Sequence, residues 1–220
     1  MIKAVLFDLD GTLVDTLEDL TDATNYALEK NGYKTLNKEQ VKEYIGNGNY
    51  NLMEKAIGKK TAKEEIEKCL NDFFDFYKDN CTKKTKPYKD IVKLLKGLKE
   101  NGIMACVVTN KADSMTQLLV PEVFKGEFTF DCVLGQCPDI PKKPQPHMVY
   151  VVMNEIGVNA DECFFVGDSY TDMLAGGSSG NIPVGVLWGY RDEKELKDNG
   201  ARFIVNEPMQ ILDLIKEINS

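Results

Sequence analysis

The chain has no surplus of positive charge, and arginine is almost absent from it. Its 220 residues include 27 Lys and Arg against 35 Asp and Glu, which gives a formal net charge of −8. A dedicated nucleic-acid-binding protein needs a basic surface that displaces the counterions of the phosphate backbone. The composition therefore argues against nucleic acid as a partner. A small anionic substrate stays compatible, because one lysine or a bound metal can reverse the charge inside a pocket.

Metal-binding cysteine pairs and membrane-spanning runs are also missing. The six cysteines form no CxxC pair and mostly stand in apolar runs, so we expect buried free thiols, with a zinc site or disulfides as the alternative. The longest uncharged stretch, Met173–Tyr190, contains five glycines, which is typical of a helix end, a loop and a strand rather than a membrane span. No signal peptide is apparent, and we expect a soluble cytoplasmic protein without a membrane partner.

Short apolar runs rich in β-branched residues recur along the chain and predict buried strands. Helical patterns separate most of them, which predicts an α/β fold with a doubly wound, Rossmann-like parallel sheet. The predicted strands are Ile2–Phe7, Ile103–Val108, Phe130–Leu134, Cys163–Val166, Val184–Leu187 and Phe203–Val205.

The alternation is interrupted after the first strand, where only amphipathic helical segments follow. About sixty-five residues are enough for a small helical domain. We predict a helical-bundle cap at 16–82 and a catalytic core made of 1–15 plus 83–220. The predicted helices of the cap are Leu17–Lys30, Lys38–Ile45, Leu52–Ile57 and Ala62–Lys78.

Acidic and hydroxyl side chains stand where several predicted strands end. Asp8 and Asp10 follow the first strand, and Thr109-Asn110 follow the strand that ends at Val108. Asp168 ends a later strand, with Asp172 one helical turn beyond it. Because ligands bind at the carboxyl ends of strands in open parallel sheets, we expect these groups to converge. The sequence therefore predicts one acidic site at this edge.

Such a cluster of carboxylates favours phosphate chemistry with a divalent cation. Converging carboxylates repel one another, and Mg²⁺ with oxygen ligands removes that cost while binding phosphate oxygens. Lys143, in a proline-rich loop, and Thr109 supply donors for a phosphate. One free carboxylate can attack phosphorus to give an aspartyl-phosphate, while a second carboxylate moves the proton.

Each element also has a purely structural interpretation. Asp8–Thr12 alone is compatible with a turn and a helix cap, and Asp168-Ser169 with an N-cap. Thr109-Asn110 alone suits a polar loop, and Lys143 a solvated charge. The coincidence of all four at strand ends favours a site. His147, directly after Pro146, is expected to lie in a first helical turn and is left out of the site.

Taken together, these motifs resemble the haloacid dehalogenase superfamily of phosphotransferases. The helical insertion is similar to the cap of the subgroup that contains phosphoglycolate phosphatase and β-phosphoglucomutase, and Ile45–Gly48 with Leu187–Arg191 look most like phosphoglycolate phosphatases. The four motifs are Asp8–Thr16, Thr109-Asn110, Lys143–Pro146 and Gly167–Asp172.

The resemblance implies a role for each matching residue. Asp8 is implied as the nucleophile and Asp10 as the acid and base. Thr109 and Asn110 would hold the phosphoryl group, and Lys143 would neutralise its charge. The resemblance also implies a Mg²⁺ site, in which Asp8, the Asp10 carbonyl oxygen and Asp168 bind the ion with Asp172 in support. The presence of Asp10 argues against dehalogenation, because the similar dehalogenases lack that acid.

The expected function is Mg²⁺-dependent hydrolysis of a small phosphorylated metabolite, with 2-phosphoglycolate as the best single candidate. Asn47 is the predicted substrate contact in the cap, although the loop 46–49 is equally compatible with a plain turn. The predicted cap holds no arginine, which usually favours bidentate anion recognition. The alternatives are a β-phosphoglucomutase-like isomerase, a pyrophosphatase, a broad-specificity phosphatase or a non-catalytic binding protein. We expect a monomer or small homo-oligomer.

Overall fold

The computed structural model describes residues 1–58 and 61–220, and Lys59 and Lys60, inside the predicted cap range, lie outside the described part. Its main sheet has six strands in the order β5-β4-β1-β6-β7-β8, and every neighbouring pair is parallel. This order, with helices on both faces, confirms the predicted fold class. The strands are β1 (Ala4–Phe7), β4 (Met104–Ala112), β5 (Cys132–Gln136), β6 (Cys163–Gly167), β7 (Ile182–Val186) and β8 (Phe203–Val205).

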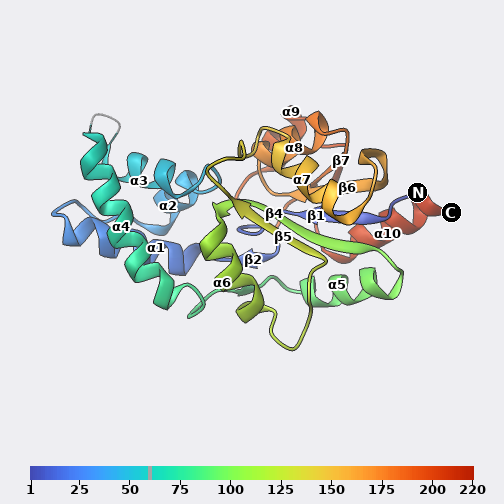
Figure 1. The fold of residues 1–220 in the computed structure, drawn as a ribbon, viewed down its shortest axis with the longest axis horizontal. Coiled ribbons are helices and arrows are strands. Elements are labelled where there is room, and N and C mark those ends of the chain that lie inside the picture. Colours follow the sequence, from blue (N-terminus) through green and yellow to red (C-terminus); the bar gives the residue numbers. More distant parts are fainter. Residues whose placement is uncertain (59–60) are drawn as a thin grey trace.

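Helices cover both faces of the sheet because the side chains of each buried strand alternate between two apolar cores. Val5 and Phe7 of β1 pack into one core, and Ala4 and Leu6 pack into the other. The first core is closed by α5 (Ile91–Glu100), α6 (Asp113–Val123) and α10 (Met209–Asn219), and the second by α7 (His147–Ile156) and α8 (Tyr170–Ser178) (Figure 1). The remaining elements of this part are η1 (Ala160–Glu162) and α9 (Glu193–Asp198).

A separate helical layer lies at one end of the molecule (Figure 1). Its helices α1 and α4 pack along each other through buried side chains that include Leu28 and Phe73. The first helix has the bounds that its apolar periodicity predicts, and α3 begins three residues before the predicted Leu52. The four helices are α1 (Leu17–Lys30), α2 (Lys38–Tyr44), α3 (Asn49–Ile57) and α4 (Lys63–Asn80).

Two segments of the chain connect the sheet to the helical layer, and these two segments pair with each other. Strands β2 (Val14–Asp15) and β3 (Lys86–Pro87) form a short antiparallel ribbon. Asp19 of α1 binds the second connecting segment. Its carboxylate accepts hydrogen bonds from the backbone N–H of Thr85 at 2.8 Å and from the Thr85 hydroxyl at 2.8 Å. The sequence did not predict this ribbon, since two-residue strands carry no periodic pattern. The boundaries at 15/16 and 82/83 stay predictions.

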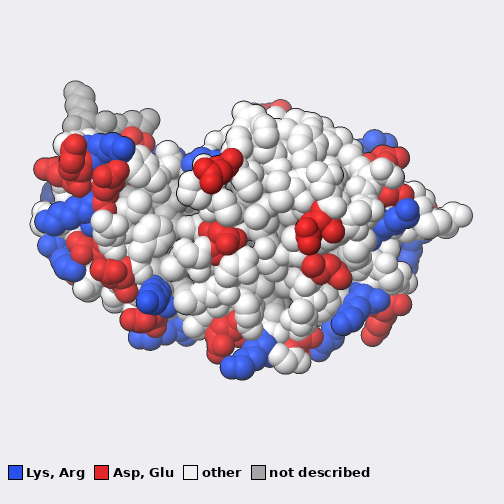
Figure 2. All heavy atoms as spheres, in the orientation of Figure 1, with Lys and Arg blue, Asp and Glu red and all other residues white. Residues whose placement is uncertain are grey.

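Basic and acidic side chains both lie on the surface. On the face drawn in Figure 2, Lys and Arg side chains are interspersed with Asp and Glu, particularly over the helical layer. Exposed pairs such as Lys96–Glu127, 2.6 Å apart, contribute little to stability. Within the described part of the chain, no helix combines the length and the apolar character that crossing a membrane requires.

Candidate active site

The polar residues predicted at the strand ends meet at one edge of the sheet. Strand β1 lies between β4 and β6, so Asp8 stands between Thr109 on one side and Asp168 on the other. A pocket of about 390 Å³, counting the part that opens to solvent, lies over this edge. Asp8, Asp10, Thr109 and Asn110 line it from the sheet, and the helical layer closes the opposite side. The predicted convergence therefore occurs in the structure.

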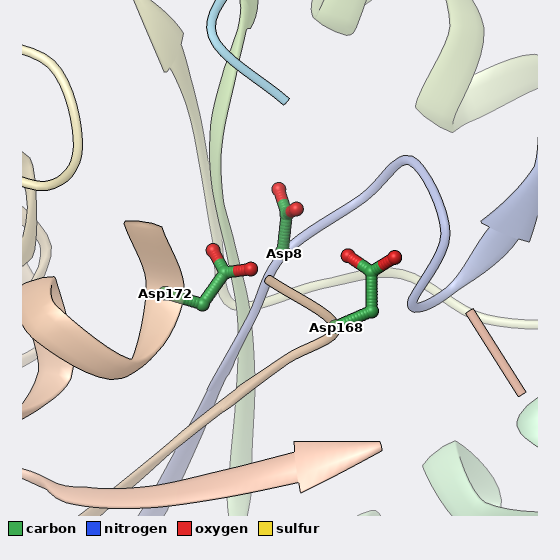
Figure 3. A group of neighbouring side chains, drawn as sticks. All are labelled: Asp8, Asp168 and Asp172. Carbon is green, nitrogen blue, oxygen red and sulfur yellow. The ribbon is translucent and has the colours of Figure 1, made fainter. Parts of the chain in front are cut away.

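Three buried carboxylates, of which Asp8 lines this pocket, stand together at the same edge of the sheet (Figure 3). One oxygen each of Asp8, Asp168 and Asp172 lies within 4.8 Å of the other two. Burial, with repulsion from Asp172 and Asp10, raises the pKa of Asp8 from 3.8 to about 6 despite the opposing effect of Lys143. Burial and the neighbouring Asp172 and Asp8 also raise the pKa of Asp168 well above its usual value. Ionising these three carboxylates together is costly, and a divalent cation would offset that cost. Because their oxygens are hard ligands, Mg²⁺ is a suitable cation.

Lys143 is the cation of this carboxylate group. Its Nζ lies 2.8 Å from Asp8 Oδ1 and 2.8 Å from Asp172 Oδ1, and it donates a third contact to the Val108 carbonyl oxygen at 2.8 Å. The side chain is 1% exposed. Burial alone would lower the pKa of Lys143, but Asp172 and Asp8 together raise it above its usual value. Lys143 therefore stays charged beside the proposed nucleophile.

Asp172 has both of its oxygens engaged. While Oδ1 faces Lys143, Oδ2 accepts hydrogen bonds from the Ser169 backbone N–H at 3.0 Å and from the Ser169 hydroxyl at 2.6 Å. Ser169 directly precedes α8 and is its N-cap residue. The structural interpretation of Asp168-Ser169 as an N-cap is therefore compatible with a place in the site. Asp172 thus fixes Lys143 to the start of a helix, and its supporting place in the metal site stays a prediction.

Two glycines allow the chain to pass against Asp168. An added Cβ at Gly11 would lie 2.4 Å from Asp168 Oδ2, and one at Gly189 would lie 2.3 Å from Asp168 Cβ. Gly11 also has a φ of 85°, which L side chains rarely adopt. The Tyr190 backbone N–H donates to Asp168 Oδ2 at 2.6 Å. The loop that begins at Leu187 therefore sets the orientation of a predicted metal ligand.

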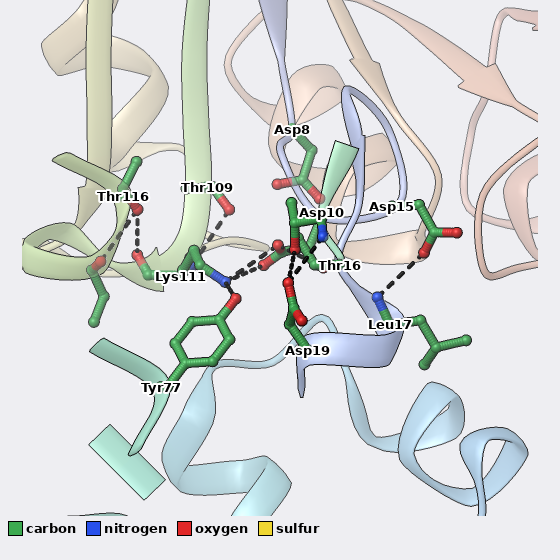
Figure 4. Close-up of polar contacts among 12 residues, drawn as sticks. Asp8, Asp10, Asp15, Thr16, Leu17, Asp19, Tyr77, Thr109, Lys111 and Thr116 are labelled. Carbon is green, nitrogen blue, oxygen red and sulfur yellow. Dashed lines mark hydrogen bonds and ion pairs between the residues drawn. The ribbon is translucent and has the colours of Figure 1, made fainter. Parts of the chain in front are cut away.

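Asp10 belongs to a second polar network, which includes Thr16 and Lys111 (Figure 4). Its Oδ1 accepts a hydrogen bond from the Thr16 hydroxyl at 2.8 Å, and both of its oxygens lie 3.2 Å from Lys111 Nζ. Lys111 also donates to the Tyr77 hydroxyl at 2.9 Å. The sequence reasoning gave Lys111 and Tyr77 no role. The one available signal was a charged residue directly after Thr109-Asn110, at the end of a strand that is apolar up to Val108.

The remaining predicted substrate contacts divide into two groups. Thr109 is 2% exposed on the pocket wall, and the Asn110 amide donates to the Gly46 carbonyl oxygen at 2.9 Å and to the Lys143 carbonyl oxygen at 2.9 Å. The Asn47 side chain instead accepts a hydrogen bond from the Tyr170 hydroxyl at 3.0 Å. Gly46, Gly48 and Asn49 line the pocket in its place. Substrate contact by Asn47 stays a prediction.

Arg191 joins the sheet to the helical layer. Its guanidinium donates to the carbonyl oxygens of Lys42 at 3.0 Å and Ile45 at 2.8 Å, where helix α2 ends. A cation at a helix C-terminus satisfies carbonyl groups that have no partner within the helix. Although the range 16–82 of the predicted cap holds no arginine, Arg191 therefore binds the helical layer at the end of α2.

In the metal-free protein, we expect stability to fall as the pH rises from about 4 to above 6. Because the pKa of Asp8 is raised from 3.8 to about 6 and that of Asp168 is also raised, the folded state binds more protons than the unfolded state in this window. Raising the pH then removes stability, about 3 kcal/mol for the shift of Asp8. Chemical denaturation in EDTA between pH 4 and pH 8 measures this trend.

Asp168→Asn serves as the control for the pH trend, because it removes one titrating group and keeps the acceptor for the Tyr190 N–H. We expect a flatter profile for this variant. Addition of Mg²⁺ is expected to restore stability above pH 6. A metal-free protein that gained stability between pH 5 and pH 7 would contradict the assignment of raised pKa values to this group.

Comparison with known proteins identifies relatives along nearly the whole chain. The family of haloacid dehalogenase-like hydrolases matches residues 5–186. Phosphoglycolate phosphatase 1 of Pseudomonas aeruginosa is 31% identical over 215 residues, which cover 96% of this chain and 78% of the relative. The N-acetylmuramic acid 6-phosphate phosphatase of the same organism is 28% identical over 217 residues, covering 97% and 95%.

A solved structure from Lactobacillus delbrueckii subsp. bulgaricus, with a provisional assignment as a phosphoglycolate phosphatase, has a TM-score of 0.90 and 32% identity. The alignment covers 97% of this chain and 98% of that one. The match therefore includes the sheet, the helical layer and the site between them. The chain belongs to the haloacid dehalogenase-like hydrolase family.

Proposed function

We propose that the protein is a Mg²⁺-dependent phosphatase that hydrolyses a small phosphorylated metabolite through an aspartyl-phosphate on Asp8. The observation that carries this proposal is the buried Asp8 carboxylate, which lines a pocket, lies 2.8 Å from Lys143 and is grouped with Asp168 and Asp172. A hydrolase family and relatives that are phosphatases support it. 2-Phosphoglycolate is the best single candidate for the substrate.

The residues present fit a Mg²⁺ site. The carboxylates of Asp8 and Asp168 and the Asp10 carbonyl oxygen would hold the ion, with Asp172 in support. When bound, Mg²⁺ neutralises phosphate oxygens and lets the anionic substrate approach a carboxylate. The chain adds a fixed positive charge of its own in Lys143, which is buried and held by three contacts. Positioning and neutralisation of this kind supply most of the catalysis in phosphoryl transfer.

In the first step, a carboxylate oxygen of Asp8 forms a bond to phosphorus while the bond between phosphorus and the ester oxygen breaks. The electron pair of that bond stays on the ester oxygen, which takes a proton from the Asp10 carboxyl group. In the second step, water gives a proton to the Asp10 carboxylate and its oxygen forms a bond to phosphorus. The bond between phosphorus and the Asp8 oxygen breaks, and its electron pair stays on the Asp8 carboxylate. Phosphate then leaves, and both aspartates return to their starting state.

The walls of the pocket suit a small leaving group. Leu20, Ile45 and Leu52 of the helical layer contribute apolar surface, while Gly46 and Gly48 bring backbone close to it. The relatives act on different compounds, since one is a phosphoglycolate phosphatase and another an N-acetylmuramic acid 6-phosphate phosphatase. The residues that line this wall are therefore the expected determinants of specificity.

Phosphate release from a panel of compounds tests the proposal. The panel contains 2-phosphoglycolate, N-acetylmuramic acid 6-phosphate, hexose phosphates and pyrophosphate, each with Mg²⁺ or with EDTA. We expect Mg²⁺-dependent release, fastest for one phosphomonoester and on the order of 10-fold or more above the others, because a few pocket contacts differ in free energy by 1–3 kcal/mol.

The same panel separates the alternative functions. Isomerisation of a hexose phosphate without release of free phosphate would show that the protein is a mutase and not a phosphatase. Preference for pyrophosphate would give a pyrophosphatase, and weak release over the whole panel would give a broad-specificity phosphatase. The absence of turnover on every compound would favour a non-catalytic binding protein.

A cytoplasmic location, supported by the six free thiols, and a monomeric or small homo-oligomeric state complete the proposal.

A further inference from the structure

Lys111 is a buried cation that the proposed mechanism does not use. It comes from the end of β4, its side chain is 1% exposed, and it lines the same pocket as Asp8. A fully buried lysine is rare unless its charge is compensated. Here both oxygens of Asp10 lie 3.2 Å from Lys111 Nζ, so the compensating group is the proposed acid and base.

A second residue holds Lys111 in this place. Tyr77 comes from α4 of the helical layer, and its hydroxyl accepts a hydrogen bond from Lys111 Nζ at 2.9 Å. The ring also lies under the ammonium group, with 4.7 Å between Nζ and the ring centroid. Tyr77 itself is fully buried and stacks on Phe73. The ammonium is thus fixed between the sheet and the helical layer (Figure 4).

We propose that Lys111, held by Tyr77, is a positioning residue that fixes the Asp10 carboxyl group for proton transfer to the leaving oxygen of an alkyl phosphate. This inference rests on the proposed phosphatase function. Asp10 gains negative charge as it gives up its proton, and a preoriented ammonium 3.2 Å away stabilises that charge. Because Tyr77 belongs to the helical layer, Asp10 is fully positioned only when that layer is docked on the sheet.

The contacts favour this role over direct binding of the substrate. A lysine that recognised a carboxylate of the substrate would need donors directed into open pocket, whereas those of Lys111 are directed at Asp10 and the Tyr77 hydroxyl. The two roles differ in which substrates they affect. Positioning of Asp10 matters for every ester whose leaving oxygen needs a proton, while carboxylate recognition matters only for substrates that carry a carboxylate.

The test compares leaving groups in Lys111→Met and Tyr77→Phe. p-Nitrophenolate leaves without a proton, whereas the alkoxides of 2-phosphoglycolate and glucose 6-phosphate need one. The ratio kcat/KM is measured because it reports the first step. We expect Lys111→Met to lose on the order of 10²-fold on both alkyl phosphates, as for removal of one oriented donor, and to change little on p-nitrophenyl phosphate. Tyr77→Phe should show a smaller loss with the same selectivity.

Lys78→Met is the matched control, because it removes an exposed lysine next to Tyr77 on α4. It should leave all three substrates unchanged. Equal losses on p-nitrophenyl phosphate and on the alkyl phosphates would overturn the proposal. So would a loss confined to 2-phosphoglycolate and seen mainly in KM, which would make Lys111 a carboxylate-binding residue.

Failure of the fold and failure of the proposed function are separable from failure of this inference. Thermal unfolding of each variant shows whether it is folded. If Lys111→Met is not, Tyr77→Phe, which keeps the buried ring, decides by its selectivity between leaving groups. If the wild-type protein with Mg²⁺ hydrolyses no phosphomonoester at all, the proposed function fails before any variant is compared.

Discussion

Replacing Asp8 by asparagine is expected to abolish turnover of every phosphoester, by about 10⁴-fold or more, as for removal of other covalent nucleophiles. Asparagine has nearly the same shape but offers no carboxylate to attack phosphorus. This substitution should leave the neighbouring side chains in place, because each has a contact that does not involve Asp8. Lys143 donates to the Val108 carbonyl oxygen, and Asp172 accepts from Ser169. Steady-state phosphate release measures the loss.

A second measurement shows whether Asp8 carries the phosphoryl group. Rapid acid quenching of the wild-type protein during turnover should yield a fraction of chains with one added phosphoryl group, mapped to the peptide that contains Asp8. Asp8→Asn should yield none. Asp139→Asn, which removes an exposed carboxylate, is the control and should keep full activity. Activity of Asp8→Asn near that of the control would contradict the nucleophile assignment.

The sequence predicts the groups at the strand ends well, because their placement follows from topology. Once β1, β4 and β6 are parallel and adjacent, the residues that follow their last apolar positions must lie at one edge. Asp8, Thr109 and Asp168 are placed in this way without knowledge of any side-chain contact. Helix α1 is predicted equally well, since its apolar positions repeat at helical spacing over fourteen residues.

The Lys111 network escapes such reasoning because its members are distant in sequence. Tyr77 is separated from Lys111 by 34 positions and Asp10 by 101. In the sequence, Tyr77 counts only as one more apolar residue on the buried face of a helix. Its hydroxyl gains a partner only through the docking of α4 on the sheet, and no local pattern encodes that docking.

The contacts of Arg191 and Asn47 depend on the same docking. Arg191 binds carbonyl oxygens of α2, and the Asn47 side chain meets Tyr170, which begins α8. Sequence reasoning marked the segments 187–191 and 45–48 as characteristic but could not assign partners to them. Pairing across two layers of structure is set by packing, so residue type alone leaves it open.

Replacing Lys143 by methionine is expected to damage both stability and activity. The substitution leaves Asp8 and Asp172 as buried carboxylates without their shared cation. Breaking a buried ion pair by removal of one partner typically costs about 3–5 kcal/mol. Activity should fall on the order of 10²–10³-fold, as for loss of one oriented positive group at a developing charge. Denaturation in EDTA and phosphate release with Mg²⁺ measure the two effects.

A double-mutant cycle separates charge from packing. If unpaired charge is the main cost of Lys143→Met, then Lys143→Met/Asp172→Asn should regain a large part of the lost stability, because one of the two stranded carboxylates is gone. Activity should not return, since the cation that faces Asp8 is still missing. Asp8 can take up a proton as its pKa lies near 6 even beside Lys143, so the instability of Lys143→Met should increase from pH 5 to pH 8. The double variant could instead be as unstable as the single one at every pH. The stability lost in Lys143→Met would then come from the packing of the Lys143 stem and not from its charge.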